Sequence, residues 1–120
     1  MTPNQLDDFV AGFLQTWSRH DVDAIMALMT EDCEFEPSAR AWGTHYQGQA
    51  EVRAAVEGLF KSAPDIQWRA VRYWATADQV VIEVLATGTN AQGEPFEIPG
   101  CDLLTLREGK IASKRAYRKL

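Results

Sequence analysis

The residue with the clearest chemical potential is Asp102, which lies in the segment PGCDLLTLREGKI. If this segment is a strand, side-chain alternation places Asp102 on one face together with Phe96, Ile98, Leu104 and Leu106. An apolar environment raises the pKa of a carboxyl group, so it can stay protonated as a hydrogen-bond donor or act as an acid or base near neutral pH. Two alternatives stay open: a hydrogen bond to a neighbouring group, or a bulge near the start of the strand where water reaches the carboxyl.

A second titratable candidate is His45, because the unperturbed pKa of histidine lies near neutrality. It lies beside Trp42 and Tyr46 in the segment 38–47, which lacks a clear periodicity and is predicted to be a loop that folds over a pocket. There His45 can act as an acid or base, or orient a ligand. The alternative is a solvated loop histidine. His20, at a predicted helix end, is interpreted as a favourable terminal charge.

Large apolar side chains can line a pocket for a flat or hydrophobic ligand. The candidate ligand-binding residues are Phe13, Trp17, Trp42, Tyr46, Phe60 and Leu104. Trp68 and Trp74 add aromatic area. Aromatic residues at helical or strand spacing can equally belong to the core, or lie on the outer face of a sheet and form a dimer interface.

Three helices are predicted to position these residues. Thr2, Pro3 and Gln5 have the types expected at a helix start with a capping box, and an apolar stripe continues from Leu6 to Trp17. Asp21 can cap a second helix whose face includes Val22, Ile25, Met26 and Met29. A third helix is predicted to follow Gly48 and to end before Pro64.

Strands are predicted around these helices. The segment from Asp32 to Pro37 alternates as a first strand, without indicating which face points inward. Four more strands are expected at about 66–77, 80–89, 95–106 and 110–118, with short joins typical of hairpins. Helices followed by an antiparallel meander indicate an α+β fold, which we expect to be one domain over residues 1–120.

Composition excludes several classes of function. A net charge of −5 argues against a nucleic-acid module, and the one basic stretch, KRAYRK, is interpreted as a solvated strand edge. Cys33 and Cys101 form no metal-ligand motif and are expected to be reduced. The sequence has no nucleotide, flavin or metal motif and no apolar run long enough for a membrane helix. We therefore expect a soluble, cytoplasmic protein that needs no cofactor and no metal.

Three segments carry a resemblance to a known family: HDVDAIMALMTEDCEFEP, YQGQAEVRAAVEGLF and PGCDLLTLREGKI. In this order they resemble the nuclear transport factor 2-like superfamily, in particular its SnoaL-like and ketosteroid-isomerase-like branch. The resemblance covers essentially the whole chain. It implies a cone-shaped, curved antiparallel sheet wrapped around about three helices, the cystatin-like roll, with a pocket at the open end and commonly a homodimer.

The resemblance also implies roles for individual residues. Asp102 resembles the aspartate that ketosteroid isomerases use as a protonated oxyanion-hole donor. Glu36 lies within one position of their general-base aspartate, although an ungapped alignment places Pro37 there, and a surface glutamate is the alternative. Phe13 stands where the oxyanion-hole tyrosine would be, and Ala116 where SnoaL-like cyclases and limonene epoxide hydrolases carry an acid. The usual ketosteroid isomerisation is therefore disfavoured.

Two hypotheses follow, because this superfamily hosts both enzymes and binding proteins. The first is a cofactor-independent isomerase, cyclase or lyase for a small hydrophobic carbonyl compound, with Asp102 as the acid and Glu36 or His45 as the base. The second is a non-catalytic ligand-binding or dimerisation module. A protein-recognition adaptor has no distinguishing residue here. In each case the expected partners are a small hydrophobic molecule and a second copy of the chain, bound through the sheet.

Overall fold

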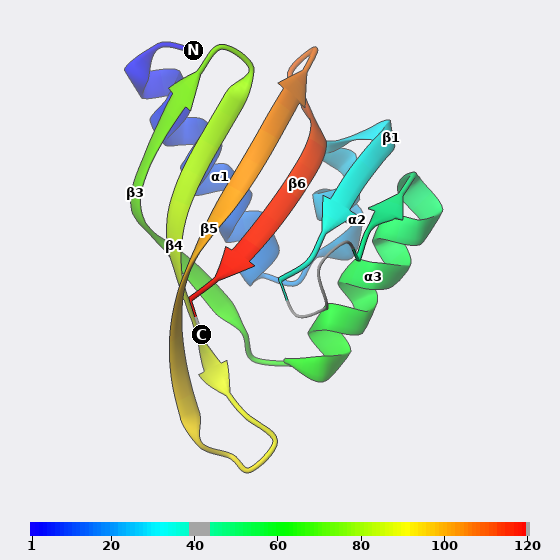
Figure 1. Ribbon diagram of the computed structural model, residues 1–120, viewed down its shortest axis with the longest axis vertical. Helices are drawn as coiled ribbons and strands as arrows, with labels where there is room; N and C mark the ends of the chain where they lie inside the picture. Colours follow the sequence, from blue (N-terminus) through cyan, green and yellow to red (C-terminus); the bar gives the residue numbers. More distant parts are fainter. Residues whose placement is uncertain (39–43, 120) are drawn as a thin grey trace.

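The computed structural model describes residues 1–38 and 44–119, and Figure 1 shows how their helices and strands are arranged. Three helices lie in the N-terminal half of the chain, and four of the six strands follow them. The elements in chain order are α1 (Pro3–Ser18), α2 (Val22–Ala27), β1 (Met29–Glu36), β2 (Tyr46–Gln47), α3 (Gln49–Ser62), β3 (Gln67–Thr76), β4 (Gln79–Thr89), β5 (Pro95–Arg107) and β6 (Lys110–Arg118). The predicted α+β fold is confirmed.

The helices begin where local sequence signals predict. Thr2 and Gln5 form the capping box of α1: each side chain accepts a hydrogen bond from the backbone N–H of the other residue. The Asp21 side chain accepts from the backbone N–H of Ala24 and caps α2. The third helix follows Gly48, whose φ of 86° lies in the left-handed region that favours glycine.

The sheet is six-stranded, curved and unclosed, with the strand order β2-β1-β6-β5-β4-β3. From β3 to β6 the strands form the predicted antiparallel meander. Strand β1 joins the free side of β6 in a parallel pairing, and β2 pairs antiparallel with β1. The meander thus gains two strands from the first half of the chain, which makes β6 a central strand.

Two sequence-based expectations are wrong at β1 and β6. Met29, expected on the face of the second helix, is a residue of β1, which begins three positions before the predicted Asp32. The reason is pairing: Met29 lies opposite Ile111 of β6, and the Ile111 N–H donates to the Leu28 carbonyl. The basic stretch KRAYRK is not a solvated edge, because β6 lies between β1 and β5.

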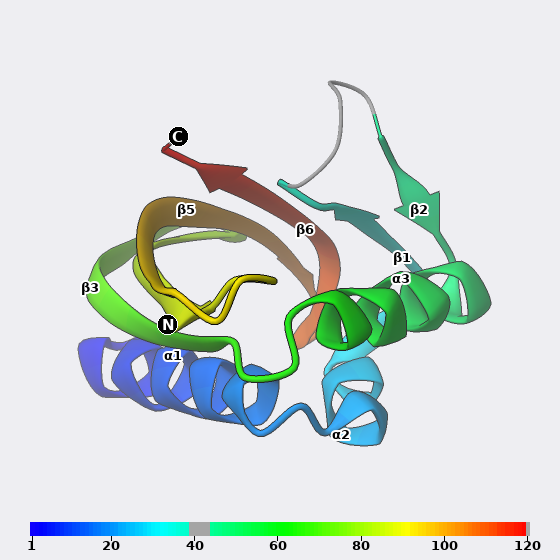
Figure 2. The same ribbon diagram turned by 90° about the horizontal axis from the view of Figure 1, so that it is seen from below.

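The concave face of the sheet encloses the core. In Figure 2 the sheet curves over α1 and α2, and α3 lies beside β1. Apolar side chains from every layer meet there and are fully buried; they include Val10, Trp17, Ile25, Phe35, Val52, Ile82 and Leu104. The inward side of β5 and β6 therefore faces an apolar interior.

Candidate functional site

Asp102 lies on the concave face of β5, opposite Ile82 of β4 and Ala116 of β6. Its side chain is 10% exposed, and its strand neighbour Leu104 is fully buried. The alternation of the sequence thus gives the correct face. The carboxyl group projects into an apolar interior and keeps only a small accessible surface.

A buried cation accompanies this carboxyl group. Lys114 Nζ lies 3.6 Å from Asp102 Oδ1, and the Lys114 side chain is 8% exposed. The same ammonium lies 4.4 Å from the ring centroid of Trp17 and 4.9 Å from that of Phe35. Aromatic ring faces attract a cation, so they replace part of the hydration that Lys114 loses on burial.

Burial changes the acidity of the Asp102 carboxyl. Loss of hydration raises its pKa above the usual value, and the positive charge of Lys114 opposes this rise without cancelling it. A carboxyl group with a raised pKa carries its proton closer to neutral pH, where it can donate a hydrogen bond or exchange a proton.

The two charged groups line a cleft, called here the Asp102 cleft, whose walls include Phe35, Leu59, Trp68 and Ile98. Its volume is about 50 Å³. At roughly 10–15 Å³ for each water molecule, that space holds about four waters. The cleft is therefore large enough for the head group of a small molecule.

A second hollow shares part of the same wall. It has a volume of about 120 Å³ and is lined by Tyr46, Ala55 and Gly58 in addition to Phe35, Pro37 and Leu59, which also line the Asp102 cleft. Its remaining lining residue is Ser62. None of the described residues that line this hollow carries a charge, and it suits an apolar group.

The other predicted acid–base residues do not reach this cleft. Glu36 is paired with Arg115, whose Nε lies 3.2 Å from Glu36 Oε2, and both residues alternate with the inward pair Phe35 and Lys114. They therefore lie on the opposite face of the sheet. The exposed His45 has its Nε2 3.5 Å from Glu34 Oε1 on that same outward side of β1.

The structure places the described ligand-binding candidates in three different surroundings, and one candidate lies outside the described residues. Phe13 and Leu104 are buried in the core, and Trp17 and Phe60 pack with Trp68 in an aromatic cluster whose ring centroids are 5.9 to 6.3 Å apart. Trp17 contacts the cleft through Lys114. Tyr46 lines the adjoining hollow, and Trp42 lies outside the described residues.

Lys114 is the residue that the sequence interpretation missed. In a regular strand every second side chain faces the same side, so the buried Ile111 would place Ser113 and Arg115 inward and Lys114 outward. In the structure Leu106 is opposite Ile111 and Thr105 is opposite Ser113, so Ala112 is an extra residue in β6. This bulge reverses the alternation and turns Lys114 inward. The sequence shows a lysine in the basic stretch KRAYRK, but it has no pattern that indicates that the Lys114 side chain points inward.

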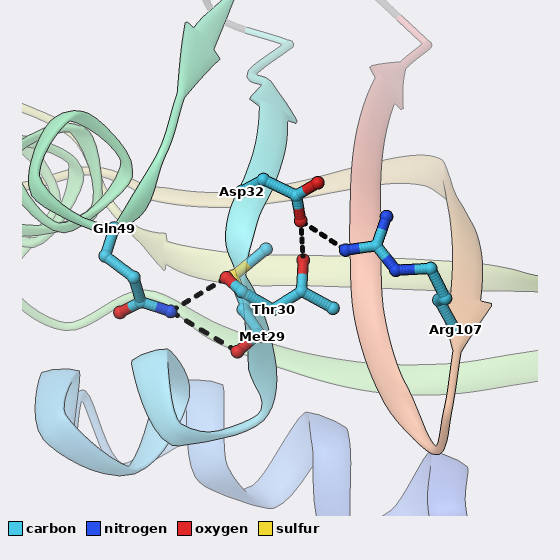
Figure 3. A network of polar contacts seen from close by, with 5 residues as sticks. All are labelled: Met29, Thr30, Asp32, Gln49 and Arg107. Atoms are coloured by element: carbon cyan, nitrogen blue, oxygen red, sulfur yellow. Dashed lines mark hydrogen bonds and ion pairs between the residues drawn. The ribbon is translucent and has the colours of Figure 1, made fainter.

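A separate network of polar contacts joins β1, the start of α3 and the end of β5, as Figure 3 shows. Gln49 Nε2, at the start of α3, donates to the carbonyl oxygens of Met29 at 3.3 Å and Thr30 at 2.9 Å. Thr30 Oγ1 donates to Asp32 Oδ1 at 2.9 Å, and Arg107 also pairs with Asp32. The Arg107 contact lowers the pKa of Asp32. Because these groups satisfy one another, we assign the network to stability.

The comparisons agree with the fold. The sequence matches the SnoaL-like domain family over residues 10–114. No match is found among curated proteins. None of the helices in the described ranges is both long and apolar enough to cross a membrane.

Several solved structures are similar in fold. A protein with a ketosteroid isomerase-like fold from Catenulispora acidiphila, in complex with trimethylamine, has a TM-score of 0.83 at 21% identity, covering 100% of this chain and 88% of that one. The epoxide hydrolase/cyclase-like enzyme SalBIII, described for pyran ring formation in the polyether salinomycin, has a TM-score of 0.83 at 23% identity, and the match covers 99% of this chain and 94% of that one. TerC, co-crystallised with polyporic acid, has a TM-score of 0.81 at 15% identity, and the match covers 95% of this chain and 91% of that one.

Proposed function

Because this chain belongs to the SnoaL-like domain family, we propose that it is a cofactor-independent acid–base enzyme, of the isomerase, cyclase or lyase kind, acting on a small hydrophobic carbonyl compound. The observation that supports this function is the buried carboxyl of Asp102, which lines a cleft of head-group size. The similar folds include an epoxide hydrolase/cyclase-like enzyme and a protein crystallised with polyporic acid. The proposal includes a single domain over residues 1–120 and a cytoplasmic location.

The proposed chemistry is a proton transfer between carbon and oxygen. The protonated Asp102 carboxyl gives its proton to the carbonyl oxygen of the substrate, and its second oxygen takes a proton from the adjacent carbon. The ketone becomes an enol, while Asp102 ends with one proton as it began. The Lys114 ammonium favours the negative charge that develops on the substrate oxygen. Returning the proton to a different carbon gives isomerisation.

The proposed mechanism assigns no step to Glu36 or His45. Glu36 pairs with Arg115 on the outward face, and His45 is beside Glu34. Among the described residues that line the cleft, Asp102 is the one carboxylate. A single carboxyl group that both donates and accepts the proton is therefore the arrangement that this cleft supports.

A non-catalytic ligand-binding module is the second candidate. It is favoured by Phe13, which is buried in the core, and by Ala116, which faces Asp102 where a second acid would complete a pair. In that case Asp102 and Lys114 would recognise the polar end of a ligand without chemical turnover.

Deuterium exchange separates the two functions. We expect the protein to accelerate exchange of hydrogen for deuterium at the carbon beside the carbonyl of 2-hexanone, a linear ketone whose head group suits the cleft, in deuterated water, followed by proton NMR. Asp102→Asn should lower the catalysed rate by about 100-fold or more, the usual size of a general acid–base contribution. Below the raised Asp102 pKa the melting temperature should change little, because the protonated carboxyl and the amide are both neutral and fill the same space.

The matched control is Glu36→Gln, which changes a carboxyl group on the outward face and should leave exchange unaffected. Equal exchange rates for the wild-type protein and Asp102→Asn would refute the proposed acid–base role. Binding of the ketone without any acceleration over the protein-free solution would support the binding module instead.

The proposal also includes a homodimer formed through the outer face of the sheet. Trp74 alternates with inward-facing residues of β3, lies opposite Val81, and is 47% exposed. Val81 is followed across the sheet by Leu103 of β5. An exposed tryptophan beside two aliphatic residues is a common feature of a protein interface.

A further inference from the structure

The charges of the Asp102 cleft are unbalanced in favour of the positive sign. Lys114 and Arg118 both line it, and Asp102 is the only acid among its described lining residues. Arg118 has no carboxylate partner within the part of the chain that the structure describes. The described lining residues therefore carry one excess positive charge when Asp102 is ionised, and two when Asp102 is protonated.

The polar ends of both inner residues also remain available. Lys114 Nζ and Asp102 Oδ1 are 3.6 Å apart, longer than an ordinary hydrogen bond, and neither group has another hydrogen-bond partner among the described residues. Their side chains keep 8% and 10% exposure, and both line the cleft. A ligand oxygen that enters the cleft can therefore accept a hydrogen bond from the ammonium.

From these observations we infer that the cleft binds its ligand through an anionic oxygen, a carboxylate or an enolate, held by Lys114 with Arg118 at a second position on the wall. This inference deepens the proposed function, on which it rests, because it names the class of substrate: small keto acids, carboxylates and acidic enols with an apolar remainder.

The same geometry disfavours a cationic ligand. The ring faces of Trp17 and Phe35 already lie against the protein's own ammonium, at 4.4 and 4.9 Å. An incoming amine would meet the positive side chains of Lys114 and Arg118, and the two ring faces nearest Lys114 already contact that ammonium. A neutral ligand would gain a hydrogen bond but no net attraction between charges.

Size sets the arrangement of the ligand. A cavity of about 150 Å³ can hold a benzene ring, and the Asp102 cleft, at about 50 Å³, is much smaller. The cleft therefore accepts a carboxylate or a keto group, while an apolar chain extends along Leu59 toward the adjoining hollow of about 120 Å³.

Binding of an anion should also depend on the proton of Asp102. Among the described residues that line the cleft, the titratable ones are Asp102, Lys114, Tyr117 and Arg118. An anion beside Asp102 binds best when that carboxyl is protonated, and burial already raises the Asp102 pKa. Affinity should therefore fall as the pH rises through the titration of Asp102, by at most tenfold for each pH unit for one linked proton.

The test compares three probes that share one chain length: hexanoate, hexanamide and hexylamine. Isothermal titration calorimetry with the full chain at pH 6 to 8 should give hexanoate a dissociation constant at least tenfold lower than that of hexanamide. Hexylamine should show no saturable binding. Similar affinities for all three probes would overturn the inference.

Variants locate the effect. Lys114→Met should abolish the preference for hexanoate over hexanamide, and Arg115→Gln, on the outward face of the same strand, should preserve it. If Lys114→Met does not fold, the double variant Lys114→Met/Asp102→Leu removes both buried charges and should also lack the preference. Retention of the preference in either folded variant would overturn the inference. In Asp102→Asn, hexanoate should still bind better than hexanamide, and its affinity should lose the pH dependence.

The result is separable from the proposed enzyme activity. A preference for hexanoate without deuterium exchange supports this inference and refutes the acid–base function. Exchange of neutral ketones without a preference for hexanoate supports the acid–base function and refutes this inference.

Discussion

Lys114 and Asp102 form an ion pair across two adjacent strands, with Nζ and Oδ1 3.6 Å apart, and the Lys114 ammonium lies over the ring of Trp17. Both side chains are about nine-tenths buried. Removing two charges from water is costly, and each group offsets part of the cost of the other. The pair is therefore expected to influence stability as well as ligand binding.

Removal of one partner should destabilise the fold more than removal of both. Above the raised Asp102 pKa, where the carboxyl is ionised, Lys114→Met leaves it buried without its cation, at an expected cost of about 3 kcal/mol or more, whereas the apolar pair Lys114→Met/Asp102→Leu should be close to the wild-type protein. Urea unfolding measures both. A double variant less stable than either single variant would contradict this coupling.

The stability of the fold should also carry a pH signature from Asp102. Because the folded-state pKa is raised, the folded protein holds this proton more tightly than the unfolded chain does. The Asp102 contribution is thus fully present below the ordinary aspartate pKa and is lost as the pH rises through the raised value. The difference in unfolding free energy between wild type and Asp102→Asn should therefore shrink or change sign with rising pH.

The comparison between wild type and Asp102→Asn is necessary because other carboxyl groups change the unfolding free energy with pH in the opposite direction. The pKa values of Asp32 and Asp65 are lowered, by Arg107 and Thr30 for the first and by Thr89 for the second. Their contribution is lost as the pH falls. A wild-type minus Asp102→Asn difference that does not vary with pH would show that Asp102 keeps its ordinary pKa.

In the network of Figure 3, Gln49 should matter more than Arg107. Gln49 Nε2 is within 3.3 Å of the carbonyl oxygens of Met26, Met29 and Thr30, so Gln49→Ala should cost about 1–3 kcal/mol by leaving buried acceptors unpaired. Arg107→Gln breaks an exposed ion pair and should cost under about 1 kcal/mol. Thermal unfolding of both variants tests the order, and a reversed order would contradict it.

The proposed dimer predicts a change of mass. Trp74→Glu places a charge on the outer face of the edge strand β3 and should convert a dimer into a monomer in light scattering, without loss of helical signal in circular dichroism. Glu97→Gln, an exposed residue on the outward side of β5, is a control that should leave the mass unchanged. A wild-type protein that is already monomeric at high concentration would refute the dimer.

Features that depend on residues close together in the sequence could be predicted from it. The capping box of Thr2 and Gln5 and the cap at Asp21 involve residues three positions apart, and both were predicted correctly. The inward face of Asp102 followed from its neighbours in one strand. Each of these features depends only on residues within one short segment of the chain.

The features that were missed depend on contacts between distant segments. Met29 joins β1 because Ile111 lies beside it, and Lys114 faces inward because of the extra residue Ala112. Neither the parallel pairing nor the bulge has a distinct pattern in the sequence. The same cause separates Glu36 from Asp102, because β1 alternation sends Phe35 inward and Glu36 outward.

The parallel pairing of β1 with β6 has a kinetic consequence. Phe35, an early residue, and Lys114, from the last strand, lie opposite each other in the wall of the cleft. Contacts of such high sequence separation form slowly, since the closure of a long loop must precede them. During synthesis on the ribosome the binding wall cannot assemble until the last strand has emerged, so any activity of the cleft reports complete folding of the chain.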